Sequence, residues 1–270
     1  MSSNLTATLR YLVPGIERPV YIASEAGADA ALDVKAKFDD RQVAVMNARE
    51  LDSPPHLDRQ GFCLVPHVTT ITDFYDLEPI RAAYEAEIIA LVLAASGGES
   101  AVVFDHTLRS DSPEVRGQRT IREPAAIIHN DYTDASAVKR LQDILSADEA
   151  KERLAKRFAI INVWRSIRGP VITSPLALCD FSSTDSGDFV ASERRAKERV
   201  GELELMTHNP GHRWYYYPEQ RLDEALLIKT FDSARDGRAR RAAHTAFNHP
   251  MAAPDAPPRE SIESRLFVFF

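Results

Sequence analysis

His129 and Asp131 are the residues whose types and spacing most directly suggest chemistry in this sequence. They follow the apolar run Ala125–Ile128, and side chains two residues apart on an extended strand project to the same face. An imidazole and a carboxylate placed in this way can both coordinate one metal ion. A second His-x-Asp pair stands at His56 and Asp58, so the spacing alone does not choose between the two pairs.

A distant histidine favours the pair at His129. His244 lies in the strand-like segment Ala242–Phe247, and two histidines with one carboxylate form a facial triad that leaves three positions open on iron. His212 is an alternative third ligand, because strand-like sequence also follows it, and His106 is a weaker one. The residues after His56 read as a turn, so we treat that pair as coincidental.

Arg259 and Ser261 form the only Arg-x-Ser in the chain and again alternate onto one face of a strand. The guanidinium fork of an arginine binds a carboxylate with two parallel hydrogen bonds, and a serine hydroxyl can assist it. The pair is therefore suited to the far end of a dicarboxylate co-substrate. Three other arginines in strand-like sequence remain candidates to share or replace this role: Arg165, Arg213 and Arg265.

Asn162 and Trp164 share one face of a further strand-like run, and we expect them to border the substrate. A buried tryptophan is more often part of a hydrophobic core, so a purely structural role for this pair stays open.

The hydrophobic patterning that must position these residues is mainly of the β type. Eight short runs are rich in Val, Ile, Trp, Tyr and Phe: Ala101–Phe104, Ala125–Ile128, Ala159–Trp164, Ser174–Cys179, Arg213–Tyr217, Ala225–Phe231, Ala242–Phe247 and Ser261–Phe270. A doubly wound nucleotide-binding fold is disfavoured, because the sequence has neither Gly-x-Gly-x-x-Gly nor a Walker loop. The runs predict a jelly roll or a related barrel with flanking helices.

Three helices are expected beside these strands. One starts at Ile80, where apolar residues recur every four positions up to Gly97, and should lie against a sheet. A second covers about Ala137–Phe158 and restarts at a capping box that begins at Ser146. The third is expected over about Ser192–Leu205, where charges alternate in sign.

Composition narrows the functional class. Of the 270 residues, 44% are hydrophobic and 27% charged, and the net charge is −7, so we expect a globular protein that binds no nucleic acid. The sequence shows neither an apolar run long enough for a bilayer nor a signal-peptide pattern, so we expect a cytoplasmic protein without a membrane partner. Two cysteines do not supply the four ligands of a structural zinc site.

Many short motifs in the same order make the chain resemble a known family. It is similar to the non-haem iron, 2-oxoglutarate-dependent oxygenases of the gibberellin-desaturase, AsaB and cephem-methoxylase group, to which the fungal endoperoxide synthase NvfI also belongs. The motifs that carry the resemblance are residues 58–62 (DRQGF), 104–109 (FDHTLR), 129–133 (HNDYT), 162–165 (NVWR), 175–180 (PLALCD), 212–218 (HRWYYYP), 229–233 (KTFDS), 244–247 (HTAF) and 257–261 (PPRES).

The resemblance implies a double-stranded β-helix core with Fe(II) on His129, Asp131 and His244, and with the distal carboxylate of 2-oxoglutarate on Arg259. It implies a single oxygenase domain over residues 1–270, in which residues 1–100 supply N-terminal strands and a supporting helix and about 101–270 form the core. Together with O2, these groups would oxidise an unactivated C–H bond of a small specialised metabolite by hydroxylation, desaturation or cyclisation, with release of succinate and CO2.

Two other functions remain open at this point. A cupin-like metal enzyme, such as a dioxygenase or isomerase, would use the same triad without 2-oxoglutarate, and a jelly-roll binding module would hold no metal. The sequence also leaves open which metabolite is oxidised and whether the chain forms a homo-oligomer.

Overall fold

The computed structural model describes residues 4–15, 18–23, 25–27, 33–196 and 199–270, which form a mainly β structure with flanking helices. The strands are β1 (Leu5–Leu12), β2 (Val20–Ile22), β3 (Asp33–Lys35), β4 (Phe38–Asn47), β5 (Phe62–Pro66), β6 (Ser100–Ser110), β7 (His129–Asn130), β8 (Phe158–Ser166), β9 (Leu176–Cys179), β10 (Phe189–Ala196), β11 (Arg199–Met206), β12 (Trp214–Tyr216), β13 (Glu224–Asp232), β14 (His244–Ala246) and β15 (Glu260–Phe269). The fold class expected from the sequence is confirmed.

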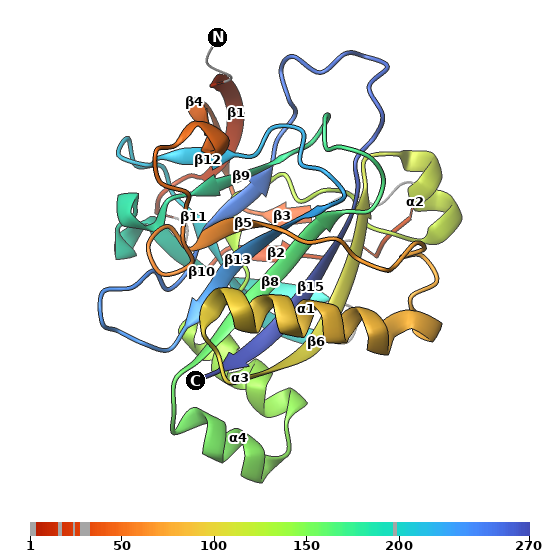
Figure 1. Cartoon of the computed structure of the whole chain (residues 1–270). Helices are drawn as coiled ribbons and strands as arrows, with labels where there is room; N and C mark the ends of the chain where they lie inside the picture. Colours follow the sequence, from red (N-terminus) through yellow and green to blue (C-terminus); the bar gives the residue numbers. More distant parts are fainter. Residues whose placement is uncertain (1–3, 16–17, 24, 28–32, 197–198) are drawn as a thin grey trace.

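The helices are few and lie around the strands (Figure 1). They are α1 (Arg81–Ser96), α2 (Pro113–Arg119), α3 (Asp134–Ile144) and α4 (Ala147–Leu154), with short 3-10 turns η1 (Ala48–Glu50), η2 (Glu78–Ile80), η3 (Phe181–Ser183) and η4 (Ser186–Asp188). None of the helices in the described part of the chain is long and apolar enough to cross a membrane.

The strands form two sheets that face each other. One has ten strands in the order β1-β4-β12-β9-β14-β7-β11-β10-β2-β3, and the other has five in the order β5-β13-β8-β15-β6. Asp131, which follows β7 of the large sheet, accepts a hydrogen bond from Asn162 on β8 of the small one (2.8 Å). The inner faces of the two sheets therefore meet around the predicted metal pair, as in a jelly roll.

The outer face of the five-stranded sheet is apolar and covered by α1, which lies across β6, β8 and β15 (Figure 1). Tyr84, Ile88 and Val92 of α1 are fully buried there, and they pack on alternate residues of the strands, among them Ala159, Ile161, Val163, Leu266 and Val268. The helix predicted from the four-residue periodicity, and its position against a sheet, are therefore confirmed. Gly97 ends it in a left-handed conformation (φ 71°), which glycine adopts without steric cost.

The inner face of the same sheet is polar at its centre. β15 runs between β8 and β6, so its inward residues each face one partner on either side. Three successive rows cross the sheet: Asn162, Arg265 and Asp105; then Trp164, Glu263 and Thr107; then Ser166, Ser261 and Arg109. A buried polar face is costly unless its groups are paired, so this is where function is expected.

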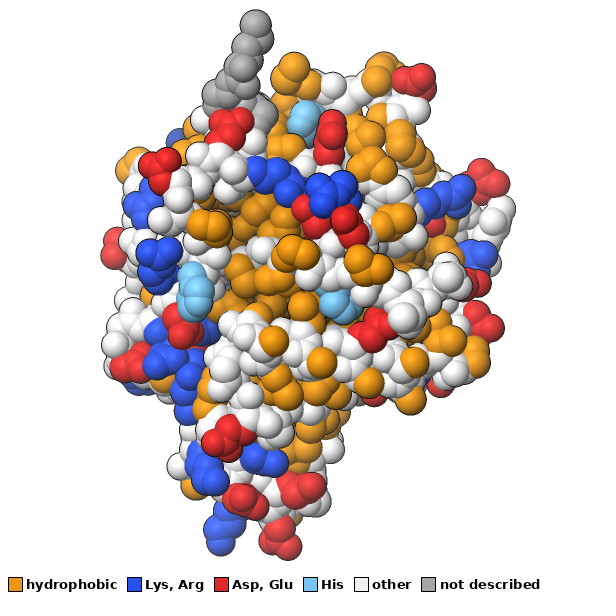
Figure 2. Space-filling view, viewed as in Figure 1, with side chains coloured by type: hydrophobic (Ala, Val, Ile, Leu, Met, Phe, Trp, Pro, Cys, Tyr) orange, Lys and Arg blue, Asp and Glu red, His pale blue; other side chains and the backbone are white. Residues whose placement is uncertain are grey.

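α3 and α4 cover one end of the sheets. As the sequence predicted, they are separate helices, because Ser146 and Glu149 form a capping box that starts α4. Ala137, Leu141 and Ala150 point to the core, and Figure 2 shows acidic and basic side chains mixed over the exposed surface at this lower end.

Two predicted elements are wrong. Ser192–Leu205 is not a helix; its described residues belong to the antiparallel hairpin of β10 and β11, while 197 and 198 lie outside the described residues. Charges that alternate in sign are also typical of an exposed helix face. Leu203 and Leu205, however, are buried two residues apart, which is the period of a strand. The run Ala125–Ile128 forms no strand either, and the short β7 begins only at His129.

Leu266 tests how strongly the fold depends on β15. Its side chain is fully buried between the sheet and α1, so Leu266→Ala should lower the free energy of unfolding by about 2–5 kcal/mol. Val200 on β11 is 60% exposed, and Val200→Ala serves as the control with little expected effect. Chemical denaturation of both variants checks this, and equal stabilities would contradict the packing described.

Candidate metal centre and co-substrate site

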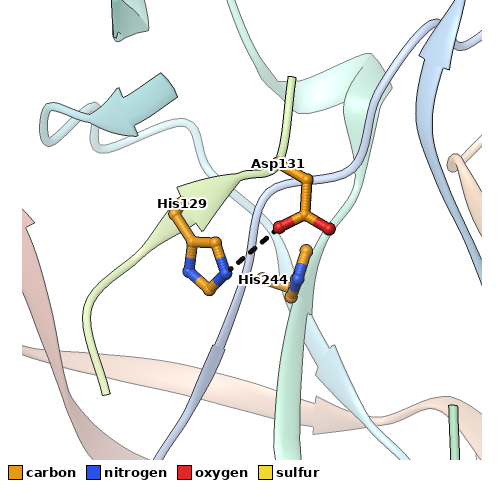
Figure 3. A group of neighbouring side chains, drawn as sticks. All are labelled: His129, Asp131 and His244. Carbon is orange, nitrogen blue, oxygen red and sulfur yellow. Dashed lines mark ion pairs between the residues drawn. The ribbon is translucent and has the colours of Figure 1, made fainter. Parts of the chain in front are cut away.

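His129 and His244 are brought together by strand pairing. β7 and β14 are antiparallel neighbours in which His129 lies directly opposite His244, and their ring centroids are 4.5 Å apart. Asp131 follows two residues after His129, and one ligand atom from each of the three residues lies within 4.8 Å of the others. Figure 3 shows the three side chains converging on one point, with Asp131 Oδ1 3.7 Å from His129 Nε2.

Both imidazoles are oriented by backbone carbonyl groups. His129 Nδ1 lies 2.8 Å from the carbonyl oxygen of Ile127, and His244 Nδ1 lies 3.0 Å from that of Ala242. Because a carbonyl oxygen only accepts, each Nδ1 carries the hydrogen and donates it. The lone pair of each ring is then on Nε2, where a metal ligand requires it.

Asp131 is held by one carboxylate oxygen, and its other oxygen has no hydrogen-bond partner among the described residues. Oδ2 accepts hydrogen bonds from Asn162 Nδ2 (2.8 Å) and Arg265 Nε (2.9 Å). No hydrogen bond is assigned to Oδ1 among the described residues, and it is the oxygen that lies nearer His129. A carboxylate fixed in this way presents one oxygen to a cation in a defined direction.

The electrostatic surroundings keep His129 and Asp131 in protonation states that could bind a metal ion. Burial, with the nearby His244, lowers the pKa of His129 to about 3, so the ring is neutral at physiological pH. Burial alone would raise the pKa of Asp131, but the charge of Arg265 and the hydrogen bond from Asn162 hold it well below its ordinary value. A neutral imidazole and an ionised carboxylate are the ligand forms a divalent cation takes.

Arg265 is the centre of the polar network behind Asp131. Besides Asp131, it donates to Asp105 and to Glu263, both at 2.6 Å, and Glu263 in turn accepts from Asn162 (2.9 Å). Burial alone would lower the pKa of Arg265, but these carboxylates raise it well above its ordinary value. From the sequence, this arginine was only a rival of Arg259. The available signal was its position among polar residues at every second place in β15.

Arg259 and Ser261 have buried polar atoms without partners. Arg259 Nε and Ser261 Oγ are enclosed and make no hydrogen bond, although Arg259 Nη1 donates to the carbonyl of Ser174 (2.6 Å) and the guanidinium lies over the Trp164 ring at 5.4 Å. No carboxylate of the described residues forms an ion pair with Arg259, and burial lowers its pKa to about 10. An unpaired buried donor costs about 1–3 kcal/mol, which a bound carboxylate would offset.

The three rival arginines are engaged elsewhere. Arg265 is saturated by Asp131 and its other carboxylates. Arg213 is 45% exposed and pairs with Asp180 at 2.8 Å. Arg165 points to the opposite face of β8 from Asn162, where it contacts His67 and Phe74.

The rival histidines are also apart from the triad. His212 lies between Asp188 and Tyr11 (3.0 and 3.2 Å). His106 bridges Ser264 and Glu85, on the side of the sheet that α1 covers.

Asn162 and Trp164 were expected to border the substrate, but both have contacts inside the protein. Asn162 is completely buried, and its amide hydrogens go to Asp131 and Glu263. Trp164 is buried under Arg259 in a hydrophobic cluster with Phe62 and Leu178. In this structure Asn162 thus orients the carboxylate, while Trp164 supports the guanidinium.

A cavity of about 680 Å³ opens beside the triad, with His129, Asp131 and Arg265 in its wall. Arg259 and Ser261 are not part of this wall. The site therefore has an open side at the cavity and a closed, polar side along β15.

Removing the amide of Asn162 should weaken metal binding without removing a ligand. Asn162→Leu leaves Asp131 with a single orienting donor, and loss of such an outer contact costs roughly 10- to 100-fold in metal affinity. Competition between the protein and a chelator for Co²⁺ measures this. His56→Leu is the control, and an unchanged affinity for the Asn162 variant would contradict the role described.

His129 should stay neutral in acid when the protein is metal-free. Its pKa is about 3 in the folded chain against an ordinary 6.5, so below pH 6.5 the unfolded chain takes up a proton that the folded chain does not. Stability contributed by the neutral ring is therefore complete above pH 6.5 and falls as the pH decreases toward 3. Nitrogen chemical shifts of His129 measured during an acid titration test this, and protonation near pH 6.5 would contradict it.

Comparison with known proteins gives the family. The family described as "Oxidoreductase/YMDC permease-like domain" matches residues 9–269. The hydroxylase/desaturase CTB9 of Cercospora beticola is 32% identical over 262 residues, which cover 88% of this chain and 79% of that protein. The Fe(II)/2-oxoglutarate-dependent dioxygenase nvfI of Aspergillus novofumigatus is 33% identical over 196 residues, 72% of this chain and 69% of that one.

The three-dimensional likeness covers the whole chain. A solved structure of the iron and alpha-ketoglutarate-dependent endoperoxidase NvfI superposes with a TM-score of 0.87 and 26% identity, over 100% of this chain and 99% of that one. The resemblance read from the motifs is thereby confirmed. This chain belongs to the family of Fe(II)/2-oxoglutarate-dependent hydroxylases, desaturases and endoperoxidases.

Proposed function

We propose that the protein is an Fe(II)- and 2-oxoglutarate-dependent oxygenase in which His129, Asp131 and His244 hold the iron. The observation that carries the proposal is the arrangement of the three ligand atoms, all within 4.8 Å of one another. Two free Nε2 atoms and one free carboxylate oxygen meet there. These donors fit a ferrous ion and leave positions open for other ligands.

The second part of the proposal places 2-oxoglutarate on Arg259 and Ser261. Arg259 directly precedes β15 and Ser261 is its second residue. Both side chains have a buried atom without a partner, Nε and Oγ, and a carboxylate would accept from both. The guanidinium is already positioned by the Ser174 carbonyl and the Trp164 ring. A cupin-like enzyme that uses no keto acid would have no need of a buried, unpaired arginine at this place.

Iron and 2-oxoglutarate, when bound, supply the oxidising power that activates O2 and breaks an unactivated C–H bond, with succinate and CO2 as co-products. The chain's own residues determine geometry. Asn162 and Arg265 hold Asp131 at one oxygen, and the carbonyls of residues 127 and 242 fix the two rings. The cavity wall decides which carbon of the substrate lies near the metal.

The proposal extends to a small-molecule substrate and to a cytoplasmic location. Curated relatives are called hydroxylase/desaturase, and the structurally similar protein is an endoperoxidase, so one framework serves several outcomes. Which outcome follows depends on how the substrate lies in the 680 Å³ cavity. We infer that the pose, rather than a change of metal ligands, selects hydroxylation, desaturation or ring closure.

Turnover of the co-substrate tests the proposed activity. With Fe(II) and O2, the protein should convert 2-oxoglutarate to succinate, and His129→Ala and Asp131→Ala should each abolish the conversion while the fold survives. His56→Ala is the matched control from the other His-x-Asp pair and should behave as wild type. Succinate formation that persists in either ligand variant would contradict the assignment.

Arg259 should govern the affinity for 2-oxoglutarate. Arg259→Gln keeps a buried polar side chain but removes the charge, and loss of a charge-assisted hydrogen bond worth about 1.5–3 kcal/mol raises KM for 2-oxoglutarate roughly 10- to 150-fold. Arg213→Gln, at a partly exposed arginine that pairs with Asp180, is the control. An unchanged KM in a stably folded Arg259 variant would favour the cupin-like alternative.

A further inference from the structure

The cavity beside the metal centre contains more arginines than its own acidic residues pair with. Seven arginines line it: Arg81, Arg109, Arg119, Arg122, Arg140, Arg194 and Arg265. Arg265 is engaged by Asp131 and Asp105, and Arg81 pairs with Glu78. The other five form no ion pair with any carboxylate in the part of the chain that the structure describes.

Three of these five arginines form a group, which we call the arginine cluster: Arg109, Arg122 and Arg194. Arg109 ends the inward row of β6 and forms an isolated parallel bridge with Arg122. Arg194 comes from β10 of the opposite sheet, beside Tyr21 of β2. All three line the same cavity as His129 and Asp131. Arg119 and Arg140 differ, because their guanidinium groups lie over the rings of Tyr75 and Phe104.

The cluster is electrostatically unfavourable as it stands. Each of the three side chains is half-buried, and like charges at short range repel one another more strongly where water is partly excluded. Burial, together with Arg109 and Arg194, lowers the pKa of Arg122. Unpaired cations held together at a cavity wall are stabilised when an anion binds between them.

The acidic residues of the wall do not neutralise the cluster. Asp105 and Asp131 face Arg265, and Glu202 pairs with Arg18 at 3.2 Å. Glu25 and Glu123 form no ion pair with a described residue, and Glu123 offers Arg109 only its backbone carbonyl (2.7 Å). Two unpaired carboxylates thus face five unpaired arginines, and the wall keeps an excess of positive charge.

We propose that the substrate carries an oxyanionic group, a carboxylate or a phosphate ester, which the arginine cluster binds while the carbon to be oxidised lies toward Asp131 and His129. This inference rests on the proposed function, because it assigns the substrate class of that same site. Arg109 lies opposite Ser261 and so borders the proposed 2-oxoglutarate site. Arg122 and Arg194 distinguish the two sites, because they line the cavity while Arg259 and Ser261 do not. Arginine forks match both kinds of oxyanion.

Binding of matched neutral and anionic probes tests the proposal. The full-length protein is loaded with Fe(II) and saturating 2-oxoglutarate without oxygen, and loading is verified by the visible absorption of the chelated keto acid. Calorimetry then compares benzoate with benzamide and 1-naphthoate with 1-naphthamide. We expect each acid to bind at least about tenfold more tightly than its amide, and phenyl phosphate compared with benzoate shows which oxyanion is preferred.

Variants of the cluster assign the preference to these residues. The double variant Arg122→Gln, Arg194→Gln should lose the acid-over-amide preference and keep the visible absorption, because neither residue lies on the inward row of β15. Arg221→Gln, at an exposed arginine paired with Asp223, should keep both.

Two results would overturn the inference: equal binding of acid and amide to the loaded wild type, including no binding of either, or a preference that survives in the double variant. Failure of the wild type to develop the absorption would count against the proposed function instead.

Discussion

The pair of hydrogen bonds on one oxygen of Asp131 is the constraint on which the site depends. Asp131 directly follows β7 of the large sheet, whereas its donors, Asn162 and Arg265, belong to the small sheet. The contact therefore joins the two sheets. Without it, the carboxylate of Asp131 would be a buried charge without a partner. It leaves the other carboxylate oxygen of Asp131 on the side of the two imidazoles. The contact thus orients the proposed ligand atom and also sets the spacing of the two sheets.

Burial makes this arrangement both costly and specific. An ionised carboxylate removed from water is stable only when its lone pairs are used, and Arg265 brings a charge that itself needs Glu263 and Asp105. Three adjacent strands of the small sheet, β8, β15 and β6, each contribute one member of the row, so the polar network depends on the register of these strands. A slip of one residue in β15 would turn Arg265 toward α1 and leave Asp131 uncompensated.

Several features of the fold and the site could be predicted from the sequence, because they depend on residues close together in the chain. The period of four in α1, the capping box at Ser146 and the shared face of His129 and Asp131 all depend on neighbours along the chain. The helix predicted over Ser192–Leu205 failed because alternating charges fit both a helix surface and a hairpin, and only the burial of Leu203 and Leu205 distinguishes them.

The pairing of strands that are distant in the sequence, and the register of that pairing, could not be predicted from the sequence. That His244 lies opposite His129, that Arg265 lies between Asn162 and Asp105, and that Arg194 faces the same cavity as Arg109 all depend on which strands pair and where. The motifs named Arg259 and Ser261, but only the folded chain shows their atoms buried without partners. Asn162 was expected to border the substrate, and the cross-strand pairing places its amide beside Asp131 and Glu263.

The central claim is that one iron and one keto acid meet at Asp131, and anaerobic titration tests it most directly. Adding Fe(II) and then 2-oxoglutarate without oxygen should produce the weak visible charge-transfer band of a chelated keto acid, saturating at one iron per chain. Asp131→Ala should show no band although its fold is intact. A wild-type protein that binds 2-oxoglutarate without the band, or an Asp131 variant that keeps it, would contradict the account.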